Sequence, residues 1–154
     1  MSLTYPEVGA TRDGDLPAGY RHVRRRARVD AFEPLAEAIA TWGIQRGAGL
    51  AVRPGAPRAA VGVEVAVGRL GLWAPARVVW VLDQPDRYGW AYGTLPGHPV
   101  SGEEAFMVGR DTGGVWFEVR AFSRPATLAG RLARPAQALI TRRYLATARR
   151  RARG

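Results

Sequence analysis

About sixty consecutive residues from Ala59 onward alternate between apolar and polar side chains, with turn residues at short intervals. A period of two places successive side chains on opposite faces of a strand, so the pattern predicts β-strands rather than helices. Connections as short as these join antiparallel neighbours, because parallel strands need a crossover of a dozen or more residues. The turns divide the segment into five predicted strands, over residues 59–67, 76–82, 88–94, 101–109 and 115–122.

A further strand and a helix are predicted before this segment. Residues 20–30 alternate, which places apolar side chains on one face and His22 with several arginines on the other. Asp30 then lies where a helix N-cap belongs, and apolar residues recur at helical spacing over residues 32–42. The glycines that follow weaken the pattern of a second short helix toward Leu50.

A long helix is predicted at the C-terminal end, and Pro135 is expected to kink or divide it. Its apolar stripe consists of Leu128, Leu132, Ala136, Leu139, Ile140 and Leu145. Such a stripe can cover one face of an antiparallel sheet. The element order therefore predicts the α+β helix-grip architecture, in which a curved antiparallel sheet wraps around a long C-terminal helix with a cavity between them. An α+β sandwich with a filled core uses the same elements, and periodicity does not separate the two.

The length of 154 residues suits one domain. Residues 1–19 are rich in proline and glycine and are predicted to form an irregular N-terminal arm. A helix-grip domain is predicted over residues 20–145. A basic tail follows over residues 146–154, and the sequence leaves open whether it is ordered. The net charge of +10 belongs to the C-terminal part, because residues 119–154 hold ten arginines and no acid. The basic and aromatic side chains are not interleaved in the way that stacks bases, so a solvated helix face is favoured over nucleic-acid binding.

Two absences exclude whole classes of chemistry. The chain has no cysteine, which rules out disulfide scaffolds, thiolate catalysis, iron–sulfur clusters and zinc ribbons. All 23 basic residues are arginines, which rules out a phosphate-loop lysine and a pyridoxal Schiff base. His22 and His98 lack metal-ligand spacing, so neither a metal nor a cofactor is expected. No apolar run or secretory signal is found, so we expect a cytoplasmic protein without a membrane span.

The stretch from Tyr92 to Phe106, YGTLPGHPVSGEEAF, is the strongest candidate for a functional segment. Its prolines and glycines predict a rigid loop that holds His98 between two strands, and rigid loops on a scaffold often carry function. A hairpin in which these residues only satisfy turn geometry is the simpler alternative.

Glu103 and Glu104 are adjacent, so on a strand they must point to opposite faces. Glu104 shares its face with Phe106 and is predicted to be a buried carboxylate, which needs a hydrogen-bond or charge partner. The available partners are Arg77, Arg120 and Tyr92. A desolvated carboxyl has a raised pKa and can act as an acid or a base, so Glu104 and His98 are the catalytic candidates. A structural ion pair at the sheet rim is the alternative, and whether the protein is an enzyme stays open.

Aromatic side chains concentrate on the predicted sheet. Alternation gives Tyr88, Trp90, Tyr92 and Thr94 one common face, and Trp116, Glu118, Arg120 and Phe122 another. Such residues either form the core or line a site for a flat or apolar ligand. The residues predicted to contact a ligand are Trp90, Tyr92, Thr94, His98, Glu104, Phe106, Trp116 and Arg120.

Several stretches together resemble uncharacterised protein family 0548, a domain-of-unknown-function family. These stretches are TYPEVGAT at 4–11, PAGYRH at 17–22, RGAGL at 46–50, YGTLPGHP at 92–99, GEEAF at 102–106, and Phe117 with AFSRP at 121–125. The resemblance covers nearly the whole chain. It implies the fold of the START-like superfamily, which includes lipid carriers, plant hormone receptors and polyketide cyclases. No activity comes with it, although His98, Glu103, Glu104, Ser123 and Pro125 match its motif positions.

We therefore expect a protein that holds a small hydrophobic or aromatic molecule between the sheet and the terminal helix. An enzyme of the same fold with acid–base chemistry is one alternative, and an arginine-rich helix that binds an acidic partner or nucleic acid is another. The sequence predicts no particular oligomeric state.

Overall fold

The computed structural model describes residues 1–132 and 134–153. Seven antiparallel strands form one sheet in the order β1-β7-β6-β5-β4-β3-β2. The strands are β1 (Arg21–Val29), β2 (Ala51–Pro54), β3 (Glu64–Arg69), β4 (Leu72–Gln84), β5 (Arg87–Thr94), β6 (Val100–Asp111) and β7 (Gly114–Pro125). The helices are α1 (Phe32–Ala40), α2 (Gly43–Gly47), α3 (Leu128–Leu132) and α4 (Arg134–Arg151). All five strands predicted from alternation are present as β3 to β7, and the short edge strand β2 is additional.

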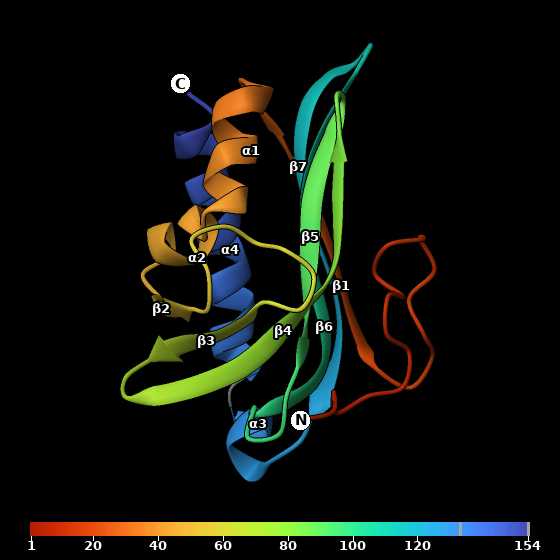
Figure 1. The fold of residues 1–154 in the computed structure, drawn as a ribbon, viewed down its shortest axis with the longest axis vertical. Coiled ribbons are helices and arrows are strands. Elements are labelled where there is room, and N and C mark those ends of the chain that lie inside the picture. The colour runs from red at the N-terminus through yellow and green to blue at the C-terminus, as the bar shows by residue number, and fades with distance from the viewer. Residues whose placement is uncertain (133, 154) are drawn as a thin grey trace.

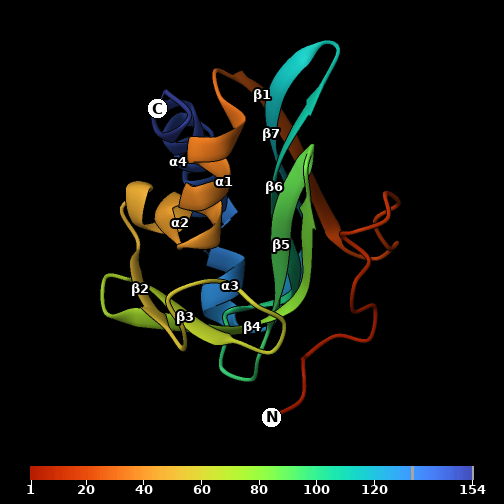
Figure 2. The same ribbon diagram turned by 45° about the horizontal axis from the view of Figure 1, so that its top comes forward.

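The helices cover one face of the sheet, and the N-terminal arm runs over the other (Figure 1). The end of the sheet formed by β3 and β4 curls beneath the helices, so that the sheet wraps around α4 (Figure 2). The register of β4 against β5 shifts between Val78 and Trp80, and such a bulge bends a strand. We call the helix-covered face concave and the arm-covered face convex. The predicted α+β helix-grip arrangement of a curved antiparallel sheet around a C-terminal helix is confirmed, whereas the cavity expected between the two stays a prediction.

The main core lies between the concave face and the helices. Trp90 on β5, Phe106 on β6 and Val119 on β7 are successive register partners, and directly opposed residues of antiparallel strands share a face. All three have no exposed surface. The indole N–H of Trp90 donates to the carbonyl oxygen of Ile39 at 2.8 Å, which joins the sheet to α1.

The convex face carries a second, smaller core. Its buried members are Trp80, Ala91, Ala105 and Met107. The arm covers the neighbouring part of this face: the ring of Tyr5 meets the ring of Phe122 edge to face at 5.6 Å, and the indole N–H of Trp80 donates to the Thr11 hydroxyl at 3.0 Å. An irregular arm thus buries apolar surface that the sheet would otherwise expose to water.

The terminal helical region differs from its prediction. It is divided, as expected, with Pro135 in the first turn of α4, where a missing N–H has no helical partner to lose. Three leucines of the predicted stripe are exposed instead of buried: Leu128, Leu132 and Leu139. The short α3 and the long α4 do not share a continuous buried stripe, and α4 packs through Tyr144, Leu145 and Ala148, followed by Ala152 just after its end.

The predicted basic tail over residues 146–154 continues α4 as far as Arg151. Ala148 and Ala152 are fully buried in the main core, so this segment contributes to the domain; Gly154 lies outside the described residues. The α4 arginines that follow Ile140, from Arg142 to Arg151, are exposed and form a solvated helix face.

Two boundaries also differ from the prediction. The N-cap of α1 is Ala31, without a side-chain hydrogen bond, rather than Asp30, because the chain stays extended for one residue more. Strand β3 begins only at Glu64. Val61 is exposed because residues 60–63 form a turn, closed by a 3.0 Å hydrogen bond from the N–H of Val63 to the carbonyl of Ala60.

Candidate functional site

Four polar side chains meet within the aromatic core of the concave face. Tyr92 on β5 and Glu104 on β6 are register partners and therefore share this face. The Tyr92 hydroxyl donates to Oε1 of Glu104 at 3.4 Å. Tyr144 comes from α4 and Gln45 from α2. We call these four residues the concave polar cluster.

Aromatic rings hold the cluster in place. The ring of Phe106 lies 5.8 Å from that of Tyr92 and 5.1 Å from that of Tyr144, each pair perpendicular. Trp90 adds a further edge contact with Tyr92 at 5.1 Å. Edge-to-face pairs of this kind are favourable beyond the area that they bury, so the two phenols are held by packing on both sides.

Gln45 is the cluster member with unmet hydrogen-bonding capacity. It has no exposed surface, yet neither its side-chain nitrogen nor its oxygen has a hydrogen-bond partner within the described residues. It lies near enough to Tyr92 to oppose part of the rise in that hydroxyl's pKa. Buried polar atoms without partners are rare in folded proteins, because each costs about 1 to 3 kcal/mol.

Burial dominates the electrostatics of the cluster. It raises the pKa of Glu104 from 4.5 to about 7, against a smaller opposing effect of the Tyr92 hydrogen bond. The pKa of Tyr144 is raised by burial first and then by the charges that Tyr92 and Glu104 would carry. No arginine contributes to the shift at Glu104, so the protonated carboxyl is well populated near neutral pH.

Only part of the cluster keeps accessible surface. Tyr92 and Glu104 are half-buried, whereas Trp90 and Phe106 are fully buried behind them. The apolar residues that pack against the same core while staying half-buried include Val52, Val67 and Ile140. A molecule on the concave face would therefore reach Tyr92 and Glu104, while Trp90 and Phe106 would support those two side chains from within the core.

His98 is engaged by its own loop. Its Nδ1 accepts the N–H of Val100 at 3.1 Å, and burial lowers the pKa of the imidazole from 6.5 to about 4. The ring is therefore neutral at neutral pH. Within the described residues it makes no hydrogen bond to the concave polar cluster, so the structure does not bring the two catalytic candidates, His98 and Glu104, together.

Three further residues predicted to contact a ligand lie elsewhere. The Thr94 hydroxyl accepts the N–H of Gly102 at 3.0 Å and pairs with the hydroxyl of Thr4. Trp116 faces the convex side, where the guanidinium of Arg26 lies 4.0 Å from its ring. Arg120 is also convex and forms a salt bridge with Glu118.

The sequence offered three partners for Glu104: Arg77, Arg120 and Tyr92. Of these, only Tyr92 is hydrogen-bonded to it. Arg120 is taken by Glu118 on the opposite face, and Arg77 pairs with Glu64 at 2.9 Å. The buried carboxyl thus lacks a counter-charge. Its hydrogen bond to a phenol cannot compensate for full ionisation, which accords with its raised pKa.

Glu103 matches a motif position of the family, but the sequence did not predict its environment. It lies on the convex face, as alternation requires, but the arm buries it to 2% exposure. Its carboxylate accepts hydrogen bonds from the Tyr5 hydroxyl at 2.6 Å, the N–H of Gly9 at 2.7 Å, and the N–H and hydroxyl of Thr11. The carboxylate therefore anchors the N-terminal arm to β6. Both segments, TYPEVGAT at 4–11 and GEEAF at 102–106, belong to the family resemblance, and these hydrogen bonds give a physical reason for their occurring together.

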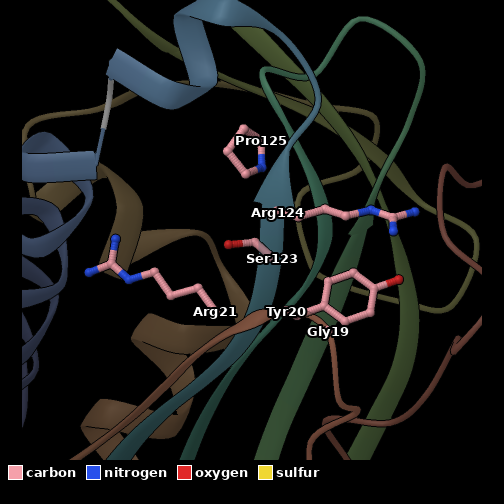
Figure 3. A pocket seen from close by; sticks show the side chains of 6 residues that line it. All are labelled: Gly19, Tyr20, Arg21, Ser123, Arg124 and Pro125. Atoms are coloured by element: carbon pink, nitrogen blue, oxygen red, sulfur yellow. The ribbon is translucent and has the colours of Figure 1, made fainter.

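A surface hollow lies where β1 begins and β7 ends (Figure 3). Arg21 points toward the helix side, whereas Tyr20 and Arg124 point the other way (Figure 3). The Tyr20 hydroxyl is already bonded to Glu7 at 2.7 Å, and the guanidinium of Arg124 lies 5.1 Å from the Tyr20 ring. Tyr20 and Arg124 are thus already engaged, so this hollow is a weaker candidate than the concave polar cluster.

Comparison with known proteins places the chain in a family. Residues 4–150 match the family described as "Domain of unknown function (DUF1990)". The chain belongs to the DUF1990 family. A UPF0548 protein of Deinococcus radiodurans is 38% identical over 159 residues, covering 91% of this DUF1990 chain and 80% of that protein. The resemblance to uncharacterised protein family 0548 is thereby confirmed.

Solved structures share the fold of this DUF1990 protein at low sequence identity. A hypothetical protein of Helicobacter pylori superposes with a TM-score of 0.67 at 10% identity, over 99% of this chain and 96% of that one. Ara h 8.0201 superposes with a TM-score of 0.52 at 7% identity, over 84% and 98% of the two chains. These similarities support the helix-grip fold. Across the described residues, the helices are too short or too polar to span a bilayer.

Proposed function

We propose that this DUF1990 protein binds a small hydrophobic or aromatic molecule between the concave face of its sheet and α4. The apolar wall would come from half-buried residues such as Val67 and Ile140, and the polar end from Tyr92 and Glu104. Ligand sites commonly combine apolar walls with a few convergent polar groups.

One observation carries the proposal: a polar cluster without a counter-charge lies inside an aromatic core. Placing a carboxyl there raises its pKa to about 7, and Gln45 adds buried polar atoms without partners. A core selected only for stability would be better served by apolar residues of similar volume. A bound molecule that pairs with Tyr92 and Glu104 would explain the polar groups at the accessible end of the cluster; Gln45, which has no exposed surface, lies behind them.

Native mass spectrometry of the protein purified from its own host tests this directly. We expect a stoichiometric small molecule that denaturing extraction releases. Ile140→Trp enlarges a half-buried α4 side chain that packs against the main core and should abolish retention of the molecule, whereas Leu139→Trp is the matched control, because Leu139 is 41% exposed.

The same pair of variants can be tested with 1-anilinonaphthalene-8-sulfonate as a fluorescent probe. Probe binding that Ile140→Trp removes and Leu139→Trp preserves would support the proposal. Equal binding by both variants, together with an empty protein in native mass spectrometry, would contradict it.

An acid–base enzyme of the same fold is the second candidate, favoured by the pKa of about 7 at Glu104. It is tested on the molecule that mass spectrometry identifies. Loss of turnover in Glu104→Ala and His98→Ala with retained binding would support the enzyme, and unchanged turnover would eliminate this mechanism.

A further inference from the structure

The accessible groups of the concave polar cluster are a phenol and a carboxyl. Tyr92 and Glu104 are half-buried, whereas Tyr144 is 3% exposed and Gln45 has no exposed surface. A bound molecule therefore meets Tyr92 and Glu104 first. Gln45 and Tyr144 lie behind them, deeper in the core.

In the free site both accessible groups can donate hydrogen bonds. The groups that act on the Glu104 carboxyl are Tyr92 from β5 and Tyr144 from α4, and neither is cationic. Burial thus favours the protonated carboxyl, which has one O–H to donate. A phenol beside a neutral carboxylic acid is a donor pair suited to a single oxygen acceptor.

The charge around the site disfavours a cationic ligand. The whole chain has a net charge of +10. Val23 on β1 lies in the same cross-strand row as Glu104, with Ala121 between them, and on the same face Val23 is flanked by Arg21 and Arg25. Positive potential at this side of the concave face repels ammonium groups and leaves neutral acceptors unaffected.

We propose that the bound molecule presents a carbonyl oxygen to the Tyr92 hydroxyl and the Glu104 carboxyl, as a neutral ketone, ester or amide on an apolar body. This inference rests on the proposed function, because it specifies the chemistry of the molecule held at that site. In this proposal the Tyr92 hydroxyl gives up its long 3.4 Å contact with Glu104, both groups donate to the carbonyl oxygen, and the apolar body would lie along the half-buried residues of β3 and α4.

Three naphthalene probes of similar shape test the proposal. They are 2-acetylnaphthalene, 2-isopropenylnaphthalene, in which a methylene replaces the carbonyl oxygen, and the cation 1-(2-naphthyl)ethylamine. Titration calorimetry at pH 6 should show the ketone binding about tenfold more tightly than the isopropenyl compound, as two neutral hydrogen bonds allow.

Variants of the two donors sharpen the test. Tyr92→Phe and Glu104→Leu should each lower ketone affinity several-fold and leave the isopropenyl compound unchanged, whereas Glu104→Gln keeps a donor and should retain most of the preference. Tyr88→Phe is the matched control, since Tyr88 lies on the same strand outside the cluster. The carbonyl ¹³C resonance of labelled 2-acetylnaphthalene should move downfield on binding and return toward its free value in Tyr92→Phe.

The outcomes separate this inference from the proposed function. If the isopropenyl compound binds as tightly as the ketone, and Ile140→Trp blocks both, the binding site stands and the carbonyl inference fails. Tightest binding of the amine also overturns the inference, in favour of an ammonium ligand. If no probe binds, both the inference and the proposed function are contradicted.

Discussion

Glu103 and Glu104 are consecutive residues of β6, yet one carboxyl anchors the N-terminal arm on the convex face and the other lies uncompensated on the concave face. Glu103 accepts four hydrogen bonds from the arm, whereas Glu104 accepts one, from Tyr92 at 3.4 Å. Their different environments follow from what covers each face. The pair therefore gives two kinds of prediction, one about stability and one about the candidate site.

The arm should detach when Glu103 is neutralised. Glu103→Gln keeps the volume but turns an NH₂ group toward donors, so we expect the free energy of unfolding to fall by about 3 kcal/mol. Urea denaturation measures this loss. Trypsin should also cleave earlier after Arg12, which lies in the arm.

Glu64→Gln is the matched control for Glu103. It removes a salt bridge between Arg77 and a half-exposed Glu64, which should cost less than about 1 kcal/mol. Equal stability losses in the two variants would contradict the anchoring role of Glu103.

Gly93 should tolerate no side chain while Tyr5 is in place. A Cβ atom at Gly93 would lie 2.2 Å from the Tyr5 hydroxyl oxygen, so Gly93→Ala must displace the ring that donates to Glu103. We expect a loss of about 2 to 3 kcal/mol in the free energy of unfolding. In a Tyr5→Ala background the same substitution should cost far less, and additive losses in this double-mutant cycle would refute the contact.

Glu104 should make stability depend on pH. The folded state holds its proton up to a pKa of about 7, compared with an ordinary value of 4.5, so the free energy of unfolding should fall as pH rises from about 4.5 to about 7. The total effect is on the order of 3 kcal/mol, since one pKa unit corresponds to about 1.4 kcal/mol. Denaturation of wild type and Glu104→Gln at pH 5 and pH 8 measures it. The stability of Glu104→Gln relative to wild type should be greater at pH 8 than at pH 5. A stability difference that is the same at both pH values would show that Glu104 titrates normally.

His98 should make the free energy of unfolding change with pH in the opposite direction to Glu104. Its folded pKa of about 4 lies below the ordinary 6.5, so the unfolded state binds the proton first and the free energy of unfolding should rise as pH increases from about 4 to about 6.5. The effects of Glu104 and His98 offset each other in wild type between pH 4.5 and 6.5. His98→Asn keeps an acceptor for Val100, and its stability should fall with rising pH in that interval; a profile parallel to wild type would contradict the prediction.

The sheet was largely predictable because its strands obey local rules. Alternation located β3 to β7, since each strand buries one face against the helices and the side-chain period of two is visible along the chain. The strand β2 was not predicted, because its four residues are too few to show the alternation of side chains, and because its pairing depends on β3. The prediction of a buried leucine stripe was wrong because hydrophobicity does not show which side of a helix faces the sheet, and Leu128, Leu132 and Leu139 stay exposed.

The candidate site was predictable only in part. Alternation placed Glu104 on one face with Phe106 and left Tyr92 as one of three possible partners, and the structure joins Tyr92 to Glu104 as register partners. Tyr144 and Gln45 could not be found in this way, because each comes from a helix whose position on the sheet is a tertiary property. The predicted set also combined two faces, since Trp116 and Arg120 lie on the convex side.

The sequence by itself determined the antiparallel strands, the helix α1, and the opposite orientation of Glu103 and Glu104, because these depend on residues close together in the chain. Tertiary structure alone decided what each carboxyl meets. Tyr5 and Glu103 are 98 residues apart, and only the fold brings the arm onto the convex face. The anchored carboxylate on one face and the protonatable carboxyl on the other arise because an arm with suitable donors covers the first, while aromatic rings without a cation cover the second.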